Sequence, residues 1–187
     1  MVVILSHRKN LHCFTWGAML LLLVACSVRQ NPQINLGAYY FVGKSDESLA
    51  SSENDKILEM SRALLLAILH KKTEIIVSMI DPDYGAIIDA KNVVPYAKVK
   101  TALLDESHPL HKTLWNEKAM QATDSTGEIH SYQKYFQSTD KIEIMIFYYS
   151  SVELEVRLNF KNRPSIGVMG NLIFQKRRGQ WYLLNFF

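Results

Sequence analysis

The sequence predicts an α+β protein in which N-terminal helices pack on a curved antiparallel sheet, forming a cone-like roll. Apolar residues recur at helical spacing between positions 54 and 80, whereas they alternate with polar residues between positions 141 and 160. A basic turn containing Gly179 then separates two apolar runs at the end of the chain. Helices followed by strands are typical of α+β folds. With 48% hydrophobic and 21% charged residues, the 187-residue chain is neither disordered nor a polytopic membrane protein.

The first 25 residues have the pattern of a secretory signal. A basic patch, His7 to Lys9, precedes an apolar run that ends at Ala25. A membrane-spanning helix needs about 20 apolar residues, which is more than this run supplies. An uncleaved anchor helix and a buried core helix remain the alternatives. Met1 to Leu5 precedes the basic patch, which leaves open whether Met1 is the true start.

The end of the apolar run, Leu23-Val24-Ala25-Cys26, resembles the lipobox of bacterial lipoproteins. The resemblance implies that residues 1–25 are removed and that Cys26 becomes the lipidated first residue, which a palmitate analogue would label. Several acyl chains hold a protein firmly, because each buried methylene contributes about 0.8 kcal/mol. We therefore expect a lipid-anchored protein of the bacterial cell envelope. Ser27 after the cysteine favours the outer membrane over the inner one, and the leaflet stays open.

Removal of the signal would also change the net charge and the number of cysteines, and with them the functions that the composition allows. Arg8 and Lys9 leave with the signal, and the formal charge falls from +3 to +1. Such a nearly neutral domain is not expected to bind nucleic acid. Cys13 also leaves and Cys26 is blocked by lipid, so the folded part has no thiol for disulfide formation, metal binding or catalysis.

We expect residues 26–52 to form a polar tether and residues 53–187 to form one α+β domain. Within the tether, the apolar stretch 36–42 is favoured to dock on the domain as a short strand. The first helix is predicted to start near Asn54 or Asp55 and to end around His70 to Lys72, where positive charge suits the helix C-terminus. Thr73 is expected to cap a second helix over 74–80, which Asp81-Pro82 ends.

The middle of the chain predicts shorter elements. Residues 86–88 suggest a strand, 93–96 an extended segment because of Pro95, and 97–105 a helix. The stretch 108–115 is ambiguous, 124–127 is a turn, and Ser131 can cap a helix that runs to Phe136. Strands are predicted at 141–149, at 152–160 with one wet polar face, and on both sides of the hairpin turn 176–180.

Two family resemblances follow from these patterns. The helical segment Ala63–Asp83 and the closing hairpin Lys176–Phe187, with its Gly-x-Trp-x-Leu pattern, resemble the nuclear-transport-factor-like superfamily. This resemblance implies a cone in which a curved sheet wraps a long helix, with a pocket between them in some members. Pro82-x-x-Gly85, Pro95-Tyr96 and Leu114-Trp115 are similar to a group of uncharacterised bacterial lipoproteins, which implies fold and location but no activity.

The polar clusters favour structural roles over catalytic or metal-binding ones. Asp81, Asp83 and Asp89 lack the spacing of a calcium loop and suit a turn. His108 and His111, with Glu117 and His130 as loose further candidates, lack a clear third zinc ligand. Asp124-Ser-Thr-Gly127 misses the aspartic-protease pattern by one residue. Nucleophile-elbow and phosphate-loop motifs are absent, and the basic tip Lys176 to Arg178 is expected to be a solvated turn.

Aromatic residues are the sequence's best candidates for a binding site. Tyr96, Tyr132, Tyr148 and Trp181 are candidate pocket residues, although an ordinary filled core is the favoured reading of this aromatic content. The sequence gives no catalytic residue, metal ligand or cofactor. We therefore expect a non-catalytic binding or interaction domain whose partner is an envelope protein or a small apolar ligand. The alternative is a pocket with isomerase- or hydrolase-like chemistry in a cone fold.

Overall fold

The structure is a computed structural model that describes residues 40–43, 51–88, 92–123, 126, 129–139, 141–160 and 171–186. These residues belong to one compact unit running from Ile34 to Phe187. In chain order its elements are β1 (Tyr40–Gly43), α2 (Ser51–Leu69), α3 (Thr73–Ser78), β2 (Ala86–Ile87), β3 (Val93–Val94), α4 (Tyr96–Leu104), α5 (Pro109–Trp115), α6 (Glu117–Ala122), α7 (Tyr132–Ser138), β4 (Ile142–Ser150), β5 (Glu153–Phe160), β6 (Leu172–Arg177) and β7 (Gln180–Asn185). The predicted α+β class is confirmed.

The strands form one sheet in the order β1-β4-β5-β6-β7-β2-β3. Strands β4 to β7 are antiparallel neighbours, as predicted, but β1 pairs with β4 and β2 pairs with β7 in parallel. The sheet is therefore mixed rather than wholly antiparallel. Parallel neighbours need long crossovers, and the helices between β1 and β4 supply one. Strand β1 also confirms that part of the apolar stretch 36–42 docks on the domain.

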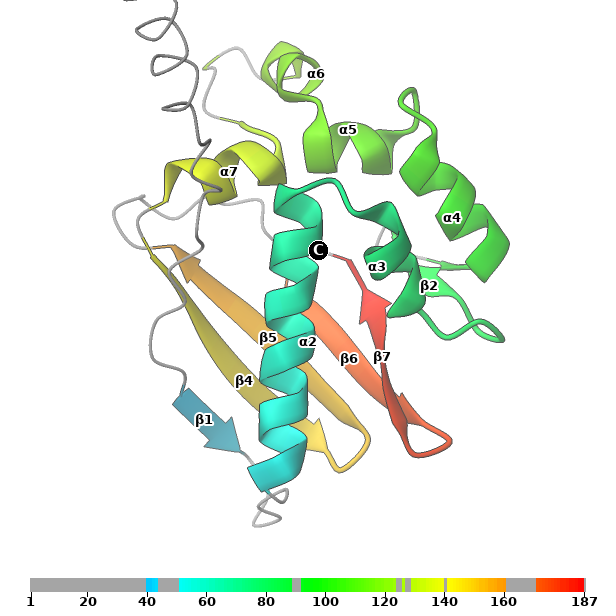
Figure 1. Ribbon diagram of the computed structural model, residues 1–187, viewed down its shortest axis with the longest axis vertical. Helices are drawn as coiled ribbons and strands as arrows, with labels where there is room; N and C mark the ends of the chain where they lie inside the picture. Colours follow the sequence, from blue (N-terminus) through cyan, green and yellow to red (C-terminus); the bar gives the residue numbers. More distant parts are fainter. Residues whose placement is uncertain are drawn as a thin grey trace, which may run out of the picture. The chain divides into compact units, whose positions relative to one another are not determined.

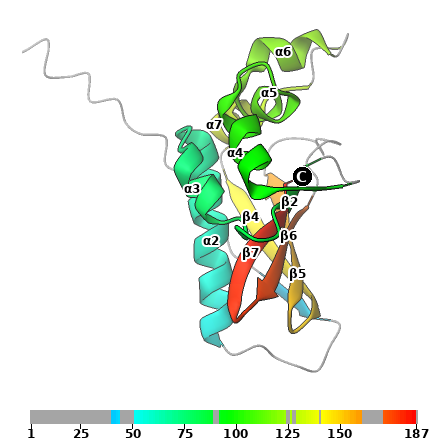
Figure 2. The same cartoon turned by 90° about the vertical axis from the view of Figure 1, so that its right-hand side faces the viewer.

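The main core lies between α2 and the face of the sheet it covers (Figure 1, Figure 2). Leu64, Leu65 and Ile68 of α2 are 0% exposed, as are Ile144 and Ile146 of β4. Their spacing explains the arrangement, because residues three or four apart share a helix face and alternate residues share a sheet face. Helix α2 starts at Ser51, ahead of the predicted Asn54 or Asp55. The positive φ of Lys71, 54°, follows its end at Leu69.

Helices α4 to α7 gather beyond one end of the sheet, close to the C-terminal end of α2 (Figure 1). Helix α3 begins at Thr73 and ends at Ser78. Its N-cap residue is Lys72, which makes no side-chain capping hydrogen bond. The prediction that Thr73 caps this helix is therefore wrong. The ambiguous stretch 108–115 contains α5, and α6 was not predicted. Ser131 caps α7 as predicted, since its side chain accepts the N–H of Lys134.

The polar face of β5 is open to solvent in part, as predicted, but it contains one buried carboxylate. Glu155 is only 3% exposed, although it alternates with apolar neighbours as expected. Both of its carboxylate oxygens accept hydrogen bonds from Arg157, at 2.9 Å each. The guanidinium of Arg157 also lies 4.2 Å from the ring centroid of Phe147. A buried carboxylate needs such partners, and Arg157 supplies them while its own side chain stays 45% exposed.

Candidate functional site

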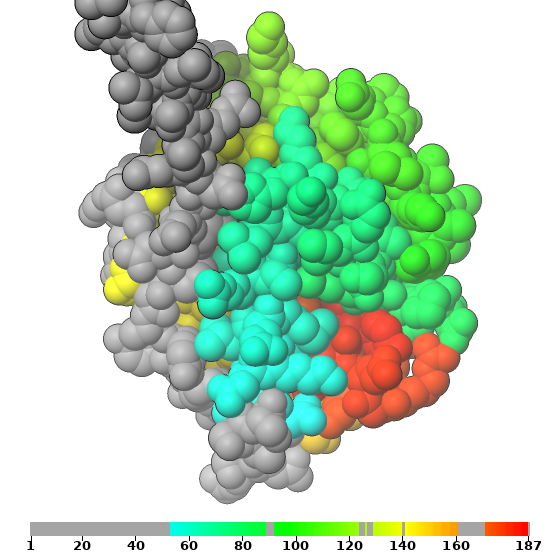
Figure 3. All heavy atoms as spheres, in the orientation of Figure 1, coloured from blue at the N-terminus to red at the C-terminus, as the bar shows by residue number. Residues whose placement is uncertain are grey.

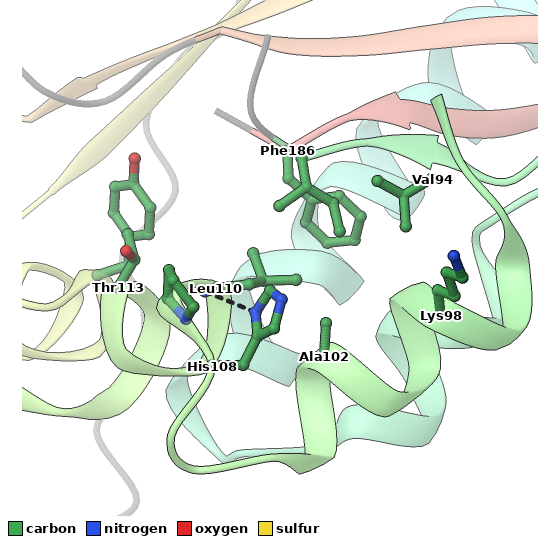
Figure 4. Close-up of a pocket in the computed structure, with 10 residues that line it drawn as sticks. Val94, Lys98, Ala102, His108, Leu110, Thr113 and Phe186 are labelled. Carbon is green, nitrogen blue, oxygen red and sulfur yellow. Dashed lines mark hydrogen bonds between the residues drawn. The ribbon is translucent and has the colours of Figure 1, made fainter. Parts of the chain in front are cut away.

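The described residues line an open pocket of about 570 Å³ between α4, α5 and the end of β7 (Figure 4). It combines apolar walls with four polar side chains that come from α4, α5 and α7. The lining residues are Ile88, Val94, Lys98, Ala102, His108, Pro109, Leu110, Thr113, Tyr132 and Phe186. In Figure 4, Val94 and Phe186 lie across the pocket from Ala102, and Lys98 and His108 lie on either side of Ala102.

Proline and turn chemistry place α4 and α5 around the pocket. Pro95 has φ −54° and ψ 146°, an extended conformation from which α4 begins at the next residue. After α4 ends, Asp105 Oδ1 accepts hydrogen bonds from the N–H and Oγ–H of Ser107 at 2.9 and 2.7 Å. Pro109 occupies the first turn of α5, where a missing N–H costs nothing. This local geometry reverses the chain tightly between the two helices.

His108 is the N-cap residue of α5 and is fixed by one hydrogen bond. Its Nδ1 accepts the backbone N–H of Leu110 at 3.1 Å. An imidazole nitrogen that accepts a hydrogen bond carries no proton, so the proton of the neutral ring is on Nε2. His108 therefore offers a hydrogen-bond donor at Nε2.

The other polar side chains of the pocket also offer donors. Lys98 is exposed on α4, one helical turn before Ala102, and its stem shares the face that Ala102 turns to the pocket. Burial raises the pKa of the Tyr132 hydroxyl, with a smaller contribution from Tyr135, so Tyr132 keeps its proton. Thr113 adds a hydroxyl. No aspartate or glutamate is among the lining residues.

The predicted pocket residues do not meet at one site. Tyr132 lines the large pocket, whereas Tyr96 lines a smaller one of about 210 Å³ beside α3. Tyr148 and Trp181 lie on the sheet, near the start of α2. Sequence reasoning missed Lys98, Ala102, Thr113 and Phe186 as lining residues. The signal it overlooked was His108-Pro109, because an N-cap residue followed by proline marks a helix start.

Tyr148 and Trp181 attach the start of α2 to the sheet. The hydroxyl of Tyr148 donates to Asn54 Oδ1 at 2.5 Å, and the indole N–H of Trp181 donates to Glu53. The bond from Trp181 is the main reason that the pKa of Glu53 is lowered. Burial, together with the charge of Glu53, raises the pKa of Tyr148 to about 12. On the face seen in Figure 3, the lower part of α2 lies beside the β6–β7 hairpin.

The basic hairpin tip and the aspartate turn neutralise each other. Arg178 donates to Asp81 Oδ1 at 2.7 Å and also bonds Asp83. The guanidinium of Arg177 lies 3.5 Å from the ring centroid of Tyr84. Lys176 Nζ is 3.2 Å from Glu53 Oε1. The pairing with Arg178 compensates the burial of Asp81, which is 3% exposed, and each of the three basic side chains of the tip has an acidic or aromatic partner. Asp89 lies outside the described residues.

The three histidines and Glu117 do not form one site, because each histidine makes a different hydrogen bond. His111 Nδ1 lies 2.9 Å from the carbonyl oxygen of Leu103, and His108 is the cap described above. Glu117 Oε1 accepts from His130 Nδ1 at 2.5 Å, and its Oε2 accepts from the N–H and Oγ–H of Ser131 at 3.0 and 3.1 Å. Burial raises the pKa of Glu117, but these bonds outweigh it and hold the pKa below its usual value.

This Glu117 cluster joins the start of α6 to the start of α7. A carboxylate that orients a histidine is one part of a catalytic dyad. Ser131, however, donates to Glu117 and caps Lys134, so it is not the nucleophile of His130. No group of three or more His, Cys, Asp or Glu residues that could hold a metal ion occurs in the described part of the chain.

No family model matches the chain, and comparison with curated proteins finds no similar sequence. The two resemblances stated from the sequence therefore stay predictions. None of the helices within the described ranges is long and apolar enough to cross a membrane. Cys26 and the preceding Leu23-Val24-Ala25 lie outside those ranges, as does most of the turn at 124–127.

Proposed function

We propose that this is a lipid-anchored protein of the bacterial cell envelope whose folded domain is a non-catalytic binding module. The pocket between α4 and α5 is its ligand site. The lipobox-like sequence from Leu23 to Cys26 supports the anchor. The pocket supports the binding role, and its combination of apolar walls with a few hydrogen-bond donors is the observation that carries the proposal.

The size and lining of the pocket are those of a small-molecule site. Its volume of about 570 Å³ lies within the range of roughly 300–1,000 Å³ typical of ligand pockets. Leu110 and Phe186 are 6% and 1% exposed, so the apolar wall is held by the core behind it. Phe186 is also fixed by its backbone N–H, which donates to the carbonyl oxygen of Ile87 at 3.2 Å. A wall built in this way is preformed for an apolar group.

The polar groups of the pocket favour binding over catalysis. A general base needs an unprotonated nitrogen or oxygen directed at the substrate. The unprotonated nitrogen of His108 is occupied by the N–H of Leu110, and its other nitrogen carries a proton. Tyr132 holds its proton at neutral pH, since burial raises its pKa, and the ammonium group of Lys98 offers donors only. The lining thus supplies donors and no base.

The binding role is tested with the full chain in phosphatidylcholine nanodiscs, carrying labelled methyl groups. Octanoate and 1-octanol are titrated while the methyl signals of Ile88, Val94 and Leu110 are followed. Binding of either probe is expected to shift these signals. Ala102→Trp places a large side chain at the pocket wall and should abolish the shifts. Val94→Trp, on the exposed edge strand, is the second blocking variant in case the first does not fold.

If neither probe produces saturable shifts of the methyl signals in the unmodified protein, the proposed binding role is wrong. Shifts that persist unchanged in both blocking variants would place the probes in the lipid and would remove it equally. The anchor is tested separately by labelling cells with a palmitate analogue. The unmodified chain should be labelled and Cys26→Ala should not, and equal labelling of both would contradict the anchor.

A further inference from the structure

We infer that the ligand of the α4–α5 pocket is an amphipathic monoanion, a carboxylate head on an apolar chain. This inference rests on the proposed binding function and adds the chemical class of the ligand. The inference is based on the positive charge of Lys98 and on the arrangement of the hydrogen-bond donors. Lys98 and His108 present donors on either side of Ala102, opposite an apolar wall.

The donors have no acidic counterpart in the pocket. Neither Asp nor Glu is among the lining residues, and no ion pair between described residues involves Lys98. The carboxylate of Asp105, at the end of α4, accepts both the N–H and the Oγ–H of Ser107. A ligand that supplies acceptors, and preferably a negative charge, would therefore pair with Lys98 and with His108 Nε2–H.

One positive charge points to one negative charge on the ligand. Lys98 is the only lysine or arginine among the residues that line the pocket, and a phosphate or a dianion is usually held by arginine or by several cations. The remaining donors, His108 Nε2–H and the hydroxyl of Thr113, are neutral. Such a set matches the two oxygens of a single carboxylate.

The remainder of the pocket accommodates the apolar chain. Val94 and Phe186 lie across from Ala102 in Figure 4, with Leu110 between the histidine and this wall. Val94 is partly buried and Lys98 is exposed, so the charged group would sit at the rim. The head would keep some water while the chain is removed from it, which is the arrangement that costs least for an amphiphile.

The test compares three probes with the same chain length: octanoate, 1-octanol and octyl phosphate. The full chain in phosphatidylcholine nanodiscs is titrated with each, and the methyl signals of Ile88 and Leu110 report binding. Octanoate is expected to bind about tenfold more tightly than 1-octanol, which corresponds to one charge-assisted hydrogen bond at a partly exposed site. Octyl phosphate should bind more weakly than octanoate.

Lys98→Met keeps most of the side-chain stem and removes the charge. We expect it to weaken octanoate binding roughly tenfold and 1-octanol binding less than twofold. Lys118→Met, on exposed α6 and outside the pocket lining, is the matched control and should change neither. His108→Asn keeps an N-cap acceptor for α5 and removes the Nε2 donor, so it should weaken octanoate by a smaller factor.

The outcomes separate the ligand class from the binding function. Equal affinity for octanoate and 1-octanol, or no effect of Lys98→Met on their ratio, would overturn the anionic class while the binding function stands. Octyl phosphate binding as tightly as octanoate would overturn the assignment to a carboxylate. If no probe binds, both the ligand class and the proposed function fail.

Discussion

The α2–sheet layer and the group of helices α4 to α7 are stabilised in different ways. Between α2 and the sheet, facing side chains are completely buried and fill the space, as Leu64 and Ile144 do. The shorter helices also bury apolar side chains in the same core, as Leu103 and Leu114 do at 0% exposure, but where they meet they leave a pocket of about 570 Å³. The comparison teaches that one continuous core is filled beneath α2 but leaves room for a ligand where the short helices meet.

The junction between the two regions is the C-terminal end of α2, whose last carbonyl groups need partners. Trp115 of α5 donates its indole N–H to the carbonyl oxygen of Ile68 at 2.8 Å. Gln133 of α7 donates to the carbonyl oxygen of Leu69 at 2.7 Å. The short helices therefore cap α2, and α2 in turn orients the helices that surround the pocket.

Leu64→Ala should have the largest effect, because it opens a cavity in the filled layer. Leu64 is 0% exposed, and truncating a buried leucine costs about 2–5 kcal/mol. We expect the free energy of unfolding, measured by urea denaturation, to fall by that amount. Leu104→Ala is the control: Leu104 is 57% exposed, and its truncation should change stability by less than about 0.5 kcal/mol. Similar losses in both variants would contradict a filled layer.

Trp115→Phe should destabilise the short helices α5 and α7 more than it destabilises α2 and the sheet. The variant removes the donor to Ile68 and some buried volume, which together cost about 1–3 kcal/mol. Amide hydrogen exchange should accelerate in α5 and α7 more than in the middle of α2, because the tie is local. Gln133→Ala should show the same pattern more weakly. Uniform acceleration throughout α2 and the sheet would mean that the two regions unfold as one.

Glu117→Gln tests the tie between α6 and α7 and should cost about 1 kcal/mol at neutral pH. Because the folded-state pKa of Glu117 is lowered, its carboxylate stabilises the fold above the unfolded-state pKa. That contribution is lost as the pH falls through the folded-state pKa. The unmodified protein should therefore lose more stability than Glu117→Gln between about pH 5 and pH 3.

The matched control for Glu117→Gln is Glu106→Gln, in the exposed turn before α5. Chemical denaturation at a series of pH values measures both variants. Glu106→Gln should follow the pH dependence of the unmodified protein. Identical curves for Glu117→Gln and the unmodified protein would show that the carboxylate bonds to His130 and Ser131 contribute nothing to stability.

Lys98→Met should have the smallest effect on stability, within about 0.5 kcal/mol, because Lys98 is exposed and makes no ion pair among the described residues. Its effect belongs to ligand binding instead. Thermal unfolding without and with octanoate checks this, since a ligand stabilises the state that it binds. A large loss of stability without ligand would show that Lys98 supports the fold and would contradict a role confined to the pocket.

Local patterns in the sequence were enough for much of the fold. The helical repeat of α2, the alternation in β4 and β5, and the Ser131 cap were predicted because each depends on neighbouring residues. The sheet order was not, since the parallel partners of β4 and β7 come from distant parts of the chain. The burial of Glu155 was also missed, because alternation along one strand does not show which neighbouring side chains will surround a carboxylate in the folded sheet.

By itself, the sequence determined the α+β class, the main helix and strands, and the absence of the recognised catalytic motifs. Only the tertiary structure decided where a pocket lies. Of the four predicted aromatic residues, only Tyr132 lines the pocket of about 570 Å³, together with Lys98 and His108. The physical reason is that periodicity reports which side of one element is buried, whereas a pocket depends on how several elements meet. Here that meeting is set by the hydrogen bonds which place α5 and α7 on the end of α2.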